Sequence, residues 1–235
     1  MRSFLKETIE NQGFVYFDGG MGTYLQVNGL KPGQLPETFN IDRPEVLKDL
    51  AYAYADAGAN ILNTNTFGAN RLKFTGQDGA YSIREIVESA VKITRQARDE
   101  YLATHPDRQA FVALDIGPTG KLLAPLGDLD FNEAVSIYKE VVRIGADAGA
   151  DLVLIETMSD SYEAKAAVLA AKENCDLPVL VTMIFDQKGK LLTGGDVDSA
   201  VAMLEGLHVD ALGVNCGMGP AQMAPVVRRL AEISS

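Results

Sequence analysis

Short apolar runs alternate along the chain with amphipathic segments of helix length, and this alternation constrains the fold more than any other feature. Six of the apolar runs end in polar residues and are predicted to be strands. They are FVYFD (14–18), NILNTNTF (60–67), FVALD (111–115), DLVLIET (151–157), PVLVTMIF (178–185) and DALGVNC (210–216). Strands that alternate with helices indicate a parallel sheet built from βα units.

The predicted helices carry start and stop signals. An aspartate stands three residues before a glutamate at three helix starts: Asp42, Asp130 and Asp160. That spacing is typical of a capping box, and the first of these helices is expected to run to about Ala57. Gly58 and Gly149 follow helix-length segments and are expected to end them in the left-handed conformation.

A repeated sequence pattern, here named the internal echo, relates three of the predicted strands. The segments DAGANILNTNT (56–66) and DAGADLVLIET (147–157) match position by position, and HVDALGVNC (208–216) joins them from Asp210 onward. The alignment places Asn65, Glu156 and Asn215 at one level, with Cys216 one residue further along its strand. The carboxyl ends of parallel strands form the catalytic face of a barrel, so these side chains are expected on one rim.

The absence of a G-x-G-x-x-G sequence after the first strands argues against a doubly wound dinucleotide-binding sheet. We therefore expect an α/β fold of the (β/α)8 TIM-barrel type, with about six of the eight βα units present. Residues 1–235 are expected to form a single domain that is incomplete at its carboxyl end.

Asp18 ends the first predicted strand and is followed by Gly19, Gly20 and Gly22. Such glycines can adopt positive φ and let the backbone approach a ligand closely, although a tight turn is the alternative. The stretch beyond them carries no clear helix signal. Because Asp18 stands at the proposed rim, we favour a ligand-binding role for this turn.

Glu156 ends an otherwise apolar strand, where an ionised carboxylate needs a partner. The partner is either a bound ammonium group or a cation of the chain such as Arg71 or Lys121. Two carboxylates on one rim, Asp18 and Glu156, suit a cationic ligand. The polar cluster around Asn65 either anchors its loop or shapes the mouth of the site.

Cys216 is the strongest single candidate for a metal-binding or catalytic residue, since a thiolate at the end of a strand can bind zinc or act as a nucleophile. The alternative is a small buried apolar residue. Cys175, His105 and His208 all precede strands and are expected at the opposite face. A Ser-His-Asp or Cys-His nucleophile system is therefore disfavoured.

The net charge of the chain argues against two kinds of binding partner. Against 32 Asp and Glu stand 21 Lys and Arg, a formal net charge of −11 that disfavours nucleic acid and anionic membranes. The sequence carries no signal-peptide pattern and no apolar run long enough for a membrane span. Two cysteines are too few for a disulfide framework, so a cytoplasmic location is expected.

Five motifs in order make the chain resemble the homocysteine S-methyltransferase family from about Gly13 onward. They are DGGMGT (18–23), AGANILNTNTFGANR (57–71), DIGPTG (115–120), IETMSD (155–160) and GVNCG (213–217). The amino-acid sequences of these motifs most resemble those of the amino-terminal homocysteine-binding module of cobalamin-dependent methionine synthases.

The resemblance implies a barrel that binds homocysteine and a zinc ion and delivers the sulfur to a methyl donor, giving methionine. It implies substrate contacts from two carboxylates and the glycine-turn backbone: Asp18, Glu156, Gly19 and Gly20. It matches Asn215 to a residue beside the metal ligand, and the shared level on the rim adds Asn65 and Asn215 as expected substrate contacts. It places the first zinc cysteine at Cys216. The family's adjacent pair of cysteines, the other two zinc ligands, is absent from this sequence.

Methylcobalamin or another methylated small molecule, delivered by downstream cobalamin- and folate-binding domains, is the expected methyl donor. Two alternatives stay open. One is a metal-free barrel transferase or aldolase that acts on an amine or a pterin. The other is a non-catalytic module that binds an amino acid or a thiol.

Overall fold

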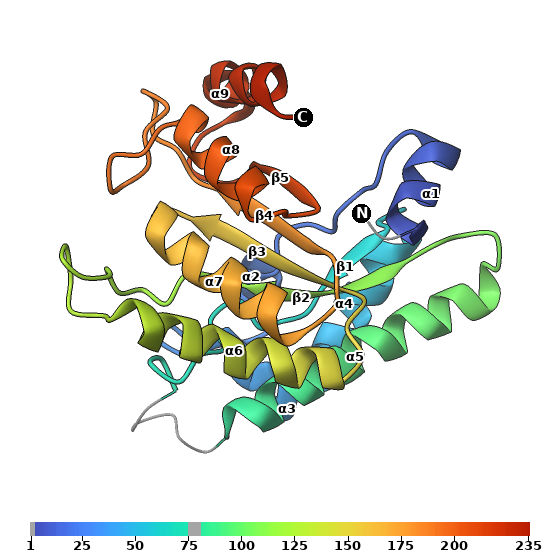
Figure 1. The fold of residues 1–235 in the computed structure, drawn as a ribbon. Coiled ribbons are helices and arrows are strands. Elements are labelled where there is room, and N and C mark those ends of the chain that lie inside the picture. The colour runs from blue at the N-terminus through green and yellow to red at the C-terminus, as the bar shows by residue number, and fades with distance from the viewer. Residues whose placement is uncertain (1–2, 75–80) are drawn as a thin grey trace. The chain divides into compact units, whose positions relative to one another are not determined.

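The computed structural model describes residues 3–74 and 81–235 as an α/β fold (Figure 1). The helical elements are α1 (Ser3–Gln12), α2 (Gly22–Val27), η1 (Pro36–Thr38), α3 (Phe39–Asp42), α4 (Pro44–Asp56), α5 (Ile83–Thr104), α6 (Phe131–Asp147), α7 (Ser161–Asn174), α8 (Val197–Gly206) and α9 (Pro220–Ile233). The strands are β1 (Ile61–Asn63), β2 (Phe111–Ile116), β3 (Leu152–Met158), β4 (Val179–Met183) and β5 (Ala211–Val214). The strands lie in sequence order in one sheet. Among the described residues, no helix is both long and apolar enough to cross a membrane.

Five of the six predicted strands are confirmed, with bounds that differ from the predicted ones by one or more residues. The first, residues 14–18, was expected to be a strand and is reduced to an isolated parallel bridge between Phe17 and Ile61. The backbone N–H groups of Asn60 and Ile61 both donate to the Tyr16 carbonyl, and the Asn60 side chain accepts from the Tyr16 N–H. Because these bonds converge on Tyr16, no regular ladder develops.

The chain divides into two compact units. The first comprises residues 1–115 and 143–152, and the second comprises residues 116–142 and 153–235. In the first unit β1 pairs in parallel with β2, Leu62 opposite Val112. Buried side chains of α4, β1 and α5 pack together there, among them Ala55, Leu62 and Tyr101. This packing fixes the position where β1 ends.

The predicted helix starts are confirmed at two aspartates and wrong at the third. Asp130 accepts from the backbone N–H groups of Asn132 and Glu133 before α6, and Asp160 accepts from Tyr162 before α7. Asp42 instead ends α3, and its carboxylate accepts from the Tyr81 hydroxyl.

A proline explains why Asp42 does not cap α4 as predicted. Pro44 opens α4 and keeps Arg43, the residue before it, out of the helical conformation at φ −142° and ψ 51°. Arg43 therefore takes the cap position in place of Asp42. Gly58 and Gly149 adopt φ of +109° and +95°, which confirms the predicted helix stops.

The stretch after the glycine turn was expected to be irregular and is helical instead. It forms α2, η1 and α3 within residues 22–42. Leu25 of α2 is fully buried and packs with Phe39, Leu47 and Ile93. The apolar pattern that drives this folding spans elements far apart in the sequence, so the local signal for a helix is weak.

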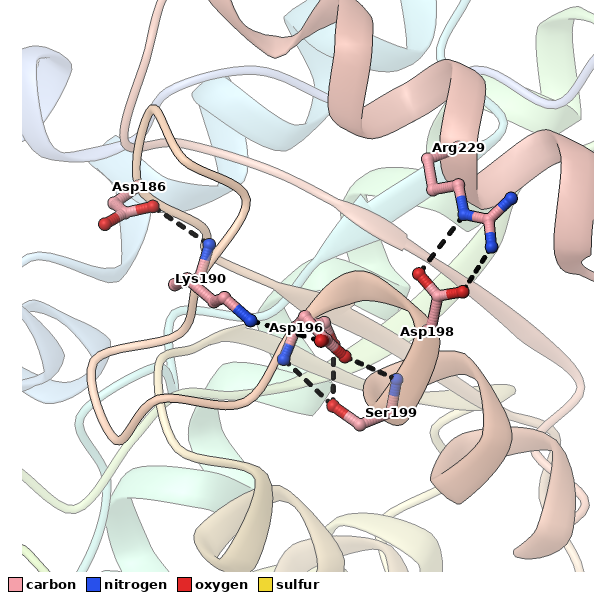
Figure 2. A network of polar contacts seen from close by, with 6 residues as sticks. All are labelled: Asp186, Lys190, Asp196, Asp198, Ser199 and Arg229. Atoms are coloured by element: carbon pink, nitrogen blue, oxygen red, sulfur yellow. Dashed lines mark hydrogen bonds and ion pairs between the residues drawn. The ribbon is translucent and has the colours of Figure 1, made fainter.

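In the second unit β3, β4 and β5 pair in parallel, and α8 and α9 lie side by side (Figure 1). Asp196 caps α8 in a capping box with Ser199, and these bonds lower the pKa of the Asp196 carboxyl to about 2. Arg229 of α9 holds Asp198 of α8, with 3.2 Å between Nε and Oδ2 (Figure 2). These exposed contacts order the helix ends, and such pairs contribute little to stability.

Candidate active site

Asp18 is held at the carboxyl end of β1 by backbone contacts within the first unit. Its N–H donates to the Ile61 carbonyl over 2.9 Å, and its Oδ2 accepts from the Asn63 N–H over 2.7 Å. The side-chain oxygen Oδ1 of Asn63 is buried without a hydrogen-bond partner among the described residues. This end of β1 therefore offers a carboxylate beside an acceptor that is open to a donor.

The glycine turn follows Asp18 directly, and Gly19 lets the Tyr54 side chain approach the backbone closely. None of Gly19, Gly20 and Gly22 has the positive φ that the sequence suggested. A Cβ added to Gly19 would lie 2.7 Å from the Tyr54 hydroxyl oxygen, and that hydroxyl donates to the Gly20 carbonyl over 3.0 Å. Burial, and then the charge of Asp18, raises the pKa of Tyr54 above its usual value.

Asn65 is buried and anchors its loop. Its side-chain nitrogen donates to the Pro36 carbonyl over 2.8 Å and to the Asn40 amide oxygen over 2.9 Å. Both amide hydrogens are thus engaged by the segment before α4. A substrate contact from Asn65 stays a prediction, and its oxygen is the atom left to make it.

The second unit brings Glu156, Asn215 and Cys216 together at the carboxyl ends of β3 and β5. The side-chain nitrogen of Asn215 lies 3.1 Å from Glu156 Oε2 and 3.5 Å from Cys216 Sγ. The common level that the internal echo predicts for Glu156 and Asn215 therefore holds. Cys216 is exposed, so its thiol is open to a metal or a substrate.

Glu156 is half-buried, and burial raises the pKa of its carboxyl. Among the described residues of the second unit no Lys or Arg forms an ion pair with it, so a pair with Lys121 is not seen there, and a pair with Arg71 of the first unit stays untested. Its hydrogen bond from Asn215 is neutral and leaves the charge uncompensated. A half-buried carboxylate in this state favours a cationic ligand.

Two threonines join this cluster that the sequence reasoning missed. Thr157 Oγ1 lies 2.8 Å from the side-chain nitrogen of Asn215 and 4.0 Å from Cys216 Sγ. Thr182 of β4 donates to the amide oxygen of Asn215 over 3.0 Å. The available signal was a single hydroxyl within the otherwise apolar run VLVTM of β4.

The remaining thiol and the imidazoles lie where the sequence predicts. Cys175 follows α7 and precedes β4, whereas Cys216 follows β5, so the two thiols stand at opposite ends of the strands. His105 lies between α5 and β2, and His208 lies between α8 and β5. Within the described residues, no three His, Cys, Asp or Glu side chains gather into a group that could hold a metal ion.

Comparison with known proteins identifies the family of this chain. A family model described as homocysteine S-methyltransferase matches residues 15–235. The chain belongs to the homocysteine S-methyltransferase family. The match spans all the residues placed above, from Asp18 to Cys216, and agrees with the family that the five motifs resemble.

Two curated relatives of this chain are methionine synthases that are much longer than the chain itself. The chain is 35% identical over 228 residues to a methionine synthase of Mycobacterium leprae, and 34% identical over 226 residues to one of Mycobacterium tuberculosis. Each match covers 92% of this chain but only 18% and 19% of the two relatives. The chain thus spans about a fifth of their length.

Solved structures of the family support the fold. The homocysteine methyltransferase MmuM of Escherichia coli, in its metallated form, superposes with a TM-score of 0.87 over 98% of this chain and 83% of that chain, at 23% identity. Its apo form gives a TM-score of 0.79. The predicted class, an α/β fold of the TIM-barrel type, is confirmed.

Proposed function

We propose that this chain binds homocysteine and presents its thiol for methylation, as the homocysteine-binding module of a methionine synthase-like methyltransferase. The observation that carries the proposal is the half-buried, uncompensated carboxylate of Glu156 beside Asn215 and Cys216. An α-ammonium group would compensate that charge. A thiol four bonds from the ammonium nitrogen then has a cysteine and an amide donor close by.

The substrate contacts follow from the placement of each group. Glu156 is proposed to accept hydrogen bonds from the ammonium group, and the Asp18 carboxylate and the backbone of Gly19 and Gly20 stay predicted substrate contacts. Asn215 donates toward sulfur, and Asn65 is proposed to contact substrate through its amide oxygen. In the transfer, the homocysteine thiol loses its proton to solvent, and the thiolate then forms a bond to the methyl carbon as the donor bond breaks.

Zinc is the proposed metal, and Cys216 is its proposed ligand in this chain. Zinc favours the deprotonated form of a thiol that it binds. Catalytic zinc sites usually carry three protein ligands, whereas no three His, Cys, Asp or Glu side chains gather among the described residues. Cys216 is therefore proposed to supply one ligand, together with donors from outside the described residues.

The methyl donor is proposed to be methylcobalamin or another methylated small molecule. Further domains that bind folate and cobalamin are its proposed source, since the methionine synthases matched here are far longer than this chain. The cytoplasm is the proposed location. The family match disfavours the alternative of a metal-free aldolase or pterin-binding transferase, and the alternative of a binding module without catalysis stays open.

Isothermal titration calorimetry with three ligands tests the proposal. Homocysteine should bind at least tenfold more tightly than 2-aminobutyrate, which lacks the sulfur, and than 4-mercaptobutyrate, which lacks the ammonium group. Equal affinity for 2-aminobutyrate would contradict a thiol-binding role. Methionine formation from homocysteine and methylcobalamin, with zinc present, would show catalysis by this chain itself, which its incomplete set of zinc ligands leads us not to expect.

A further inference from the structure

The strand pairing at the candidate site is irregular in a specific way. Ile155 of β3 pairs with Val181 of β4, and Met158 pairs with Met183. Two residues of β3, Glu156 and Thr157, therefore stand opposite Thr182 alone. This is the residue count of a β-bulge, a feature that redirects side chains and is frequent beside active sites.

The bulge places two consecutive side chains on one partner. In a regular strand Glu156 and Thr157 would point to opposite faces of the sheet. Here both reach the side-chain nitrogen of Asn215, Glu156 Oε2 at 3.1 Å and Thr157 Oγ1 at 2.8 Å. Thr157 has φ of +61°, a strained conformation for a β-branched residue that its surroundings must hold in place.

The Thr182 side chain holds Thr157 in this strained conformation. Its hydroxyl oxygen accepts from the Thr157 backbone N–H over 3.3 Å, and its single proton is donated to the Asn215 amide oxygen over 3.0 Å. The methyl group of Thr182 packs above Gly213, its register partner on β5, at 3.8 Å from where a Cβ would stand. One side chain thus bonds to both strands that carry the site.

The direction of the hydrogen bonds follows from this arrangement. A side-chain amide can adopt two orientations that differ by exchange of its oxygen and nitrogen. The Thr182 hydroxyl engages the oxygen of Asn215, so the nitrogen faces Thr157 and Cys216. Thr157 receives a hydrogen from that nitrogen and directs its own proton at Cys216 Sγ, 4.0 Å away.

We propose that Thr182 is a positioning residue, which fixes the Asn215 amide and the β3 bulge so that the Thr157 hydroxyl points at the sulfur of Cys216 and the Asn215 nitrogen lies beside that sulfur. The role of this geometry in homocysteine binding rests on the proposed function. The geometry itself can be tested without ligand or metal.

Nuclear magnetic resonance on the 235-residue protein tests the geometry. The wild type should show nuclear Overhauser contacts from the Asn215 side-chain amide protons to Thr157 and to the β-protons of Cys216. Thr182→Val keeps the methyl packing and the shape but removes the hydroxyl, so these contacts should be lost. Thr182→Ser keeps the hydroxyl and should retain them.

Three outcomes would overturn the proposal: contacts that persist in Thr182→Val, contacts that are lost equally in Thr182→Ser, or a wild type without the contacts. The third outcome keeps the test decisive if Thr182→Val does not fold. Calorimetry then asks whether Thr182→Val binds homocysteine at least fivefold more weakly than Thr182→Ser. If the wild type shows the contacts but binds no homocysteine, the proposed function fails while the positioning role stands.

Discussion

The side-chain nitrogen of Asn215 lies 3.1 Å from the Glu156 carboxylate, so one hydrogen bond joins the carboxyl ends of β3 and β5. The bond orients Glu156 without neutralising it. Burial raises the pKa of this carboxyl, and no cation among the described residues of the second unit pairs with it. Glu156 is therefore arranged to receive a charge from outside the protein.

The first prediction concerns that charge. Glu156→Gln keeps the shape and the acceptor for Asn215 but removes the ion pair with an ammonium group. A hydrogen bond to a charged group contributes about 1.5–3 kcal/mol, so homocysteine should bind roughly 10- to 150-fold more weakly. Isothermal titration calorimetry measures the change.

Glu173→Gln is the matched control, because Glu173 is an exposed residue of α7 and carries the same charge. Its affinity for homocysteine should equal that of the wild type. An unchanged affinity in Glu156→Gln together with a lower melting temperature would show that Glu156 is structural.

The second prediction concerns a buried carboxylate in the second unit. Glu163 accepts hydrogen bonds through Oε1 from the Thr119 N–H at 2.8 Å and from the Tyr138 hydroxyl at 2.8 Å. Tyr138→Phe removes one donor to a buried charge and should lower the free energy of unfolding by about 1–3 kcal/mol. Urea denaturation measures it.

Tyr162→Phe is the control for that experiment. Tyr162 is 45% exposed and stacks on Phe131, a contact that phenylalanine keeps. Its unfolding free energy should change by less than about 0.5 kcal/mol. Equal effects in the two variants would mean that the Tyr138 hydroxyl contributes nothing specific.

The third prediction concerns pH. Glu37 is 3% exposed, its Oε1 accepts from the Gly68 N–H, and its Oε2 has no hydrogen-bond partner among the described residues. Burial raises the pKa of this carboxyl above 4.5. The folded protein therefore holds the proton to a higher pH than the unfolded chain does, and the wild type loses stability as pH rises from 4.5 through the raised pKa.

Glu37→Gln lacks this titration. Its free energy of unfolding, relative to the wild type, should rise across that window and stay level at lower pH. Glu45→Gln should show the opposite trend, because the hydrogen bond from Arg43 lowers the pKa of the exposed Glu45. Urea denaturation between pH 3 and pH 7 compares them, and a pH-independent difference for Glu37→Gln would refute the assignment.

Local sequence signals accounted for much of the fold. Five apolar runs became strands because burial and alternation with helices are visible along the chain, and the caps at Asp130 and Asp160 depend on neighbours two or three residues away. The internal echo correctly placed Glu156 level with Asn215. Asn65 matches them in the alignment, but its amide is held by Asn40, 25 residues away, which no local pattern reports.

The bulge at Thr157 was beyond the reach of the sequence for a related reason. Neither a glycine nor an asparagine marks the left-handed position, and the extra residue of β3 becomes visible only against the register of β4. The hydroxyl of Thr182 acquires its role through the same pairing. Such positions are determined by neighbouring strands rather than by local propensity.

The fourth prediction concerns zinc. Because the described residues provide no group of three donors, the 235-residue chain should retain well under one zinc per molecule after dialysis against a weak chelator. Elemental analysis measures the content, with Cys216→Ser as the control for binding through that thiol. One zinc retained per chain, and lost in Cys216→Ser, would contradict the account of missing ligands.

The most direct test of homocysteine binding at this site is chemical-shift mapping on the 15N-labelled protein. Adding homocysteine should shift the side-chain amide signals of Asn215 and the backbone amide signals of Thr157 and Cys216, and 2-aminobutyrate should shift them less. The control residue Lys92, on the exposed surface of α5, should not respond. The absence of shifts at Asn215, Thr157 and Cys216 at saturating homocysteine, or shifts confined to other parts of the chain, would contradict the assignment of this cluster as the substrate site.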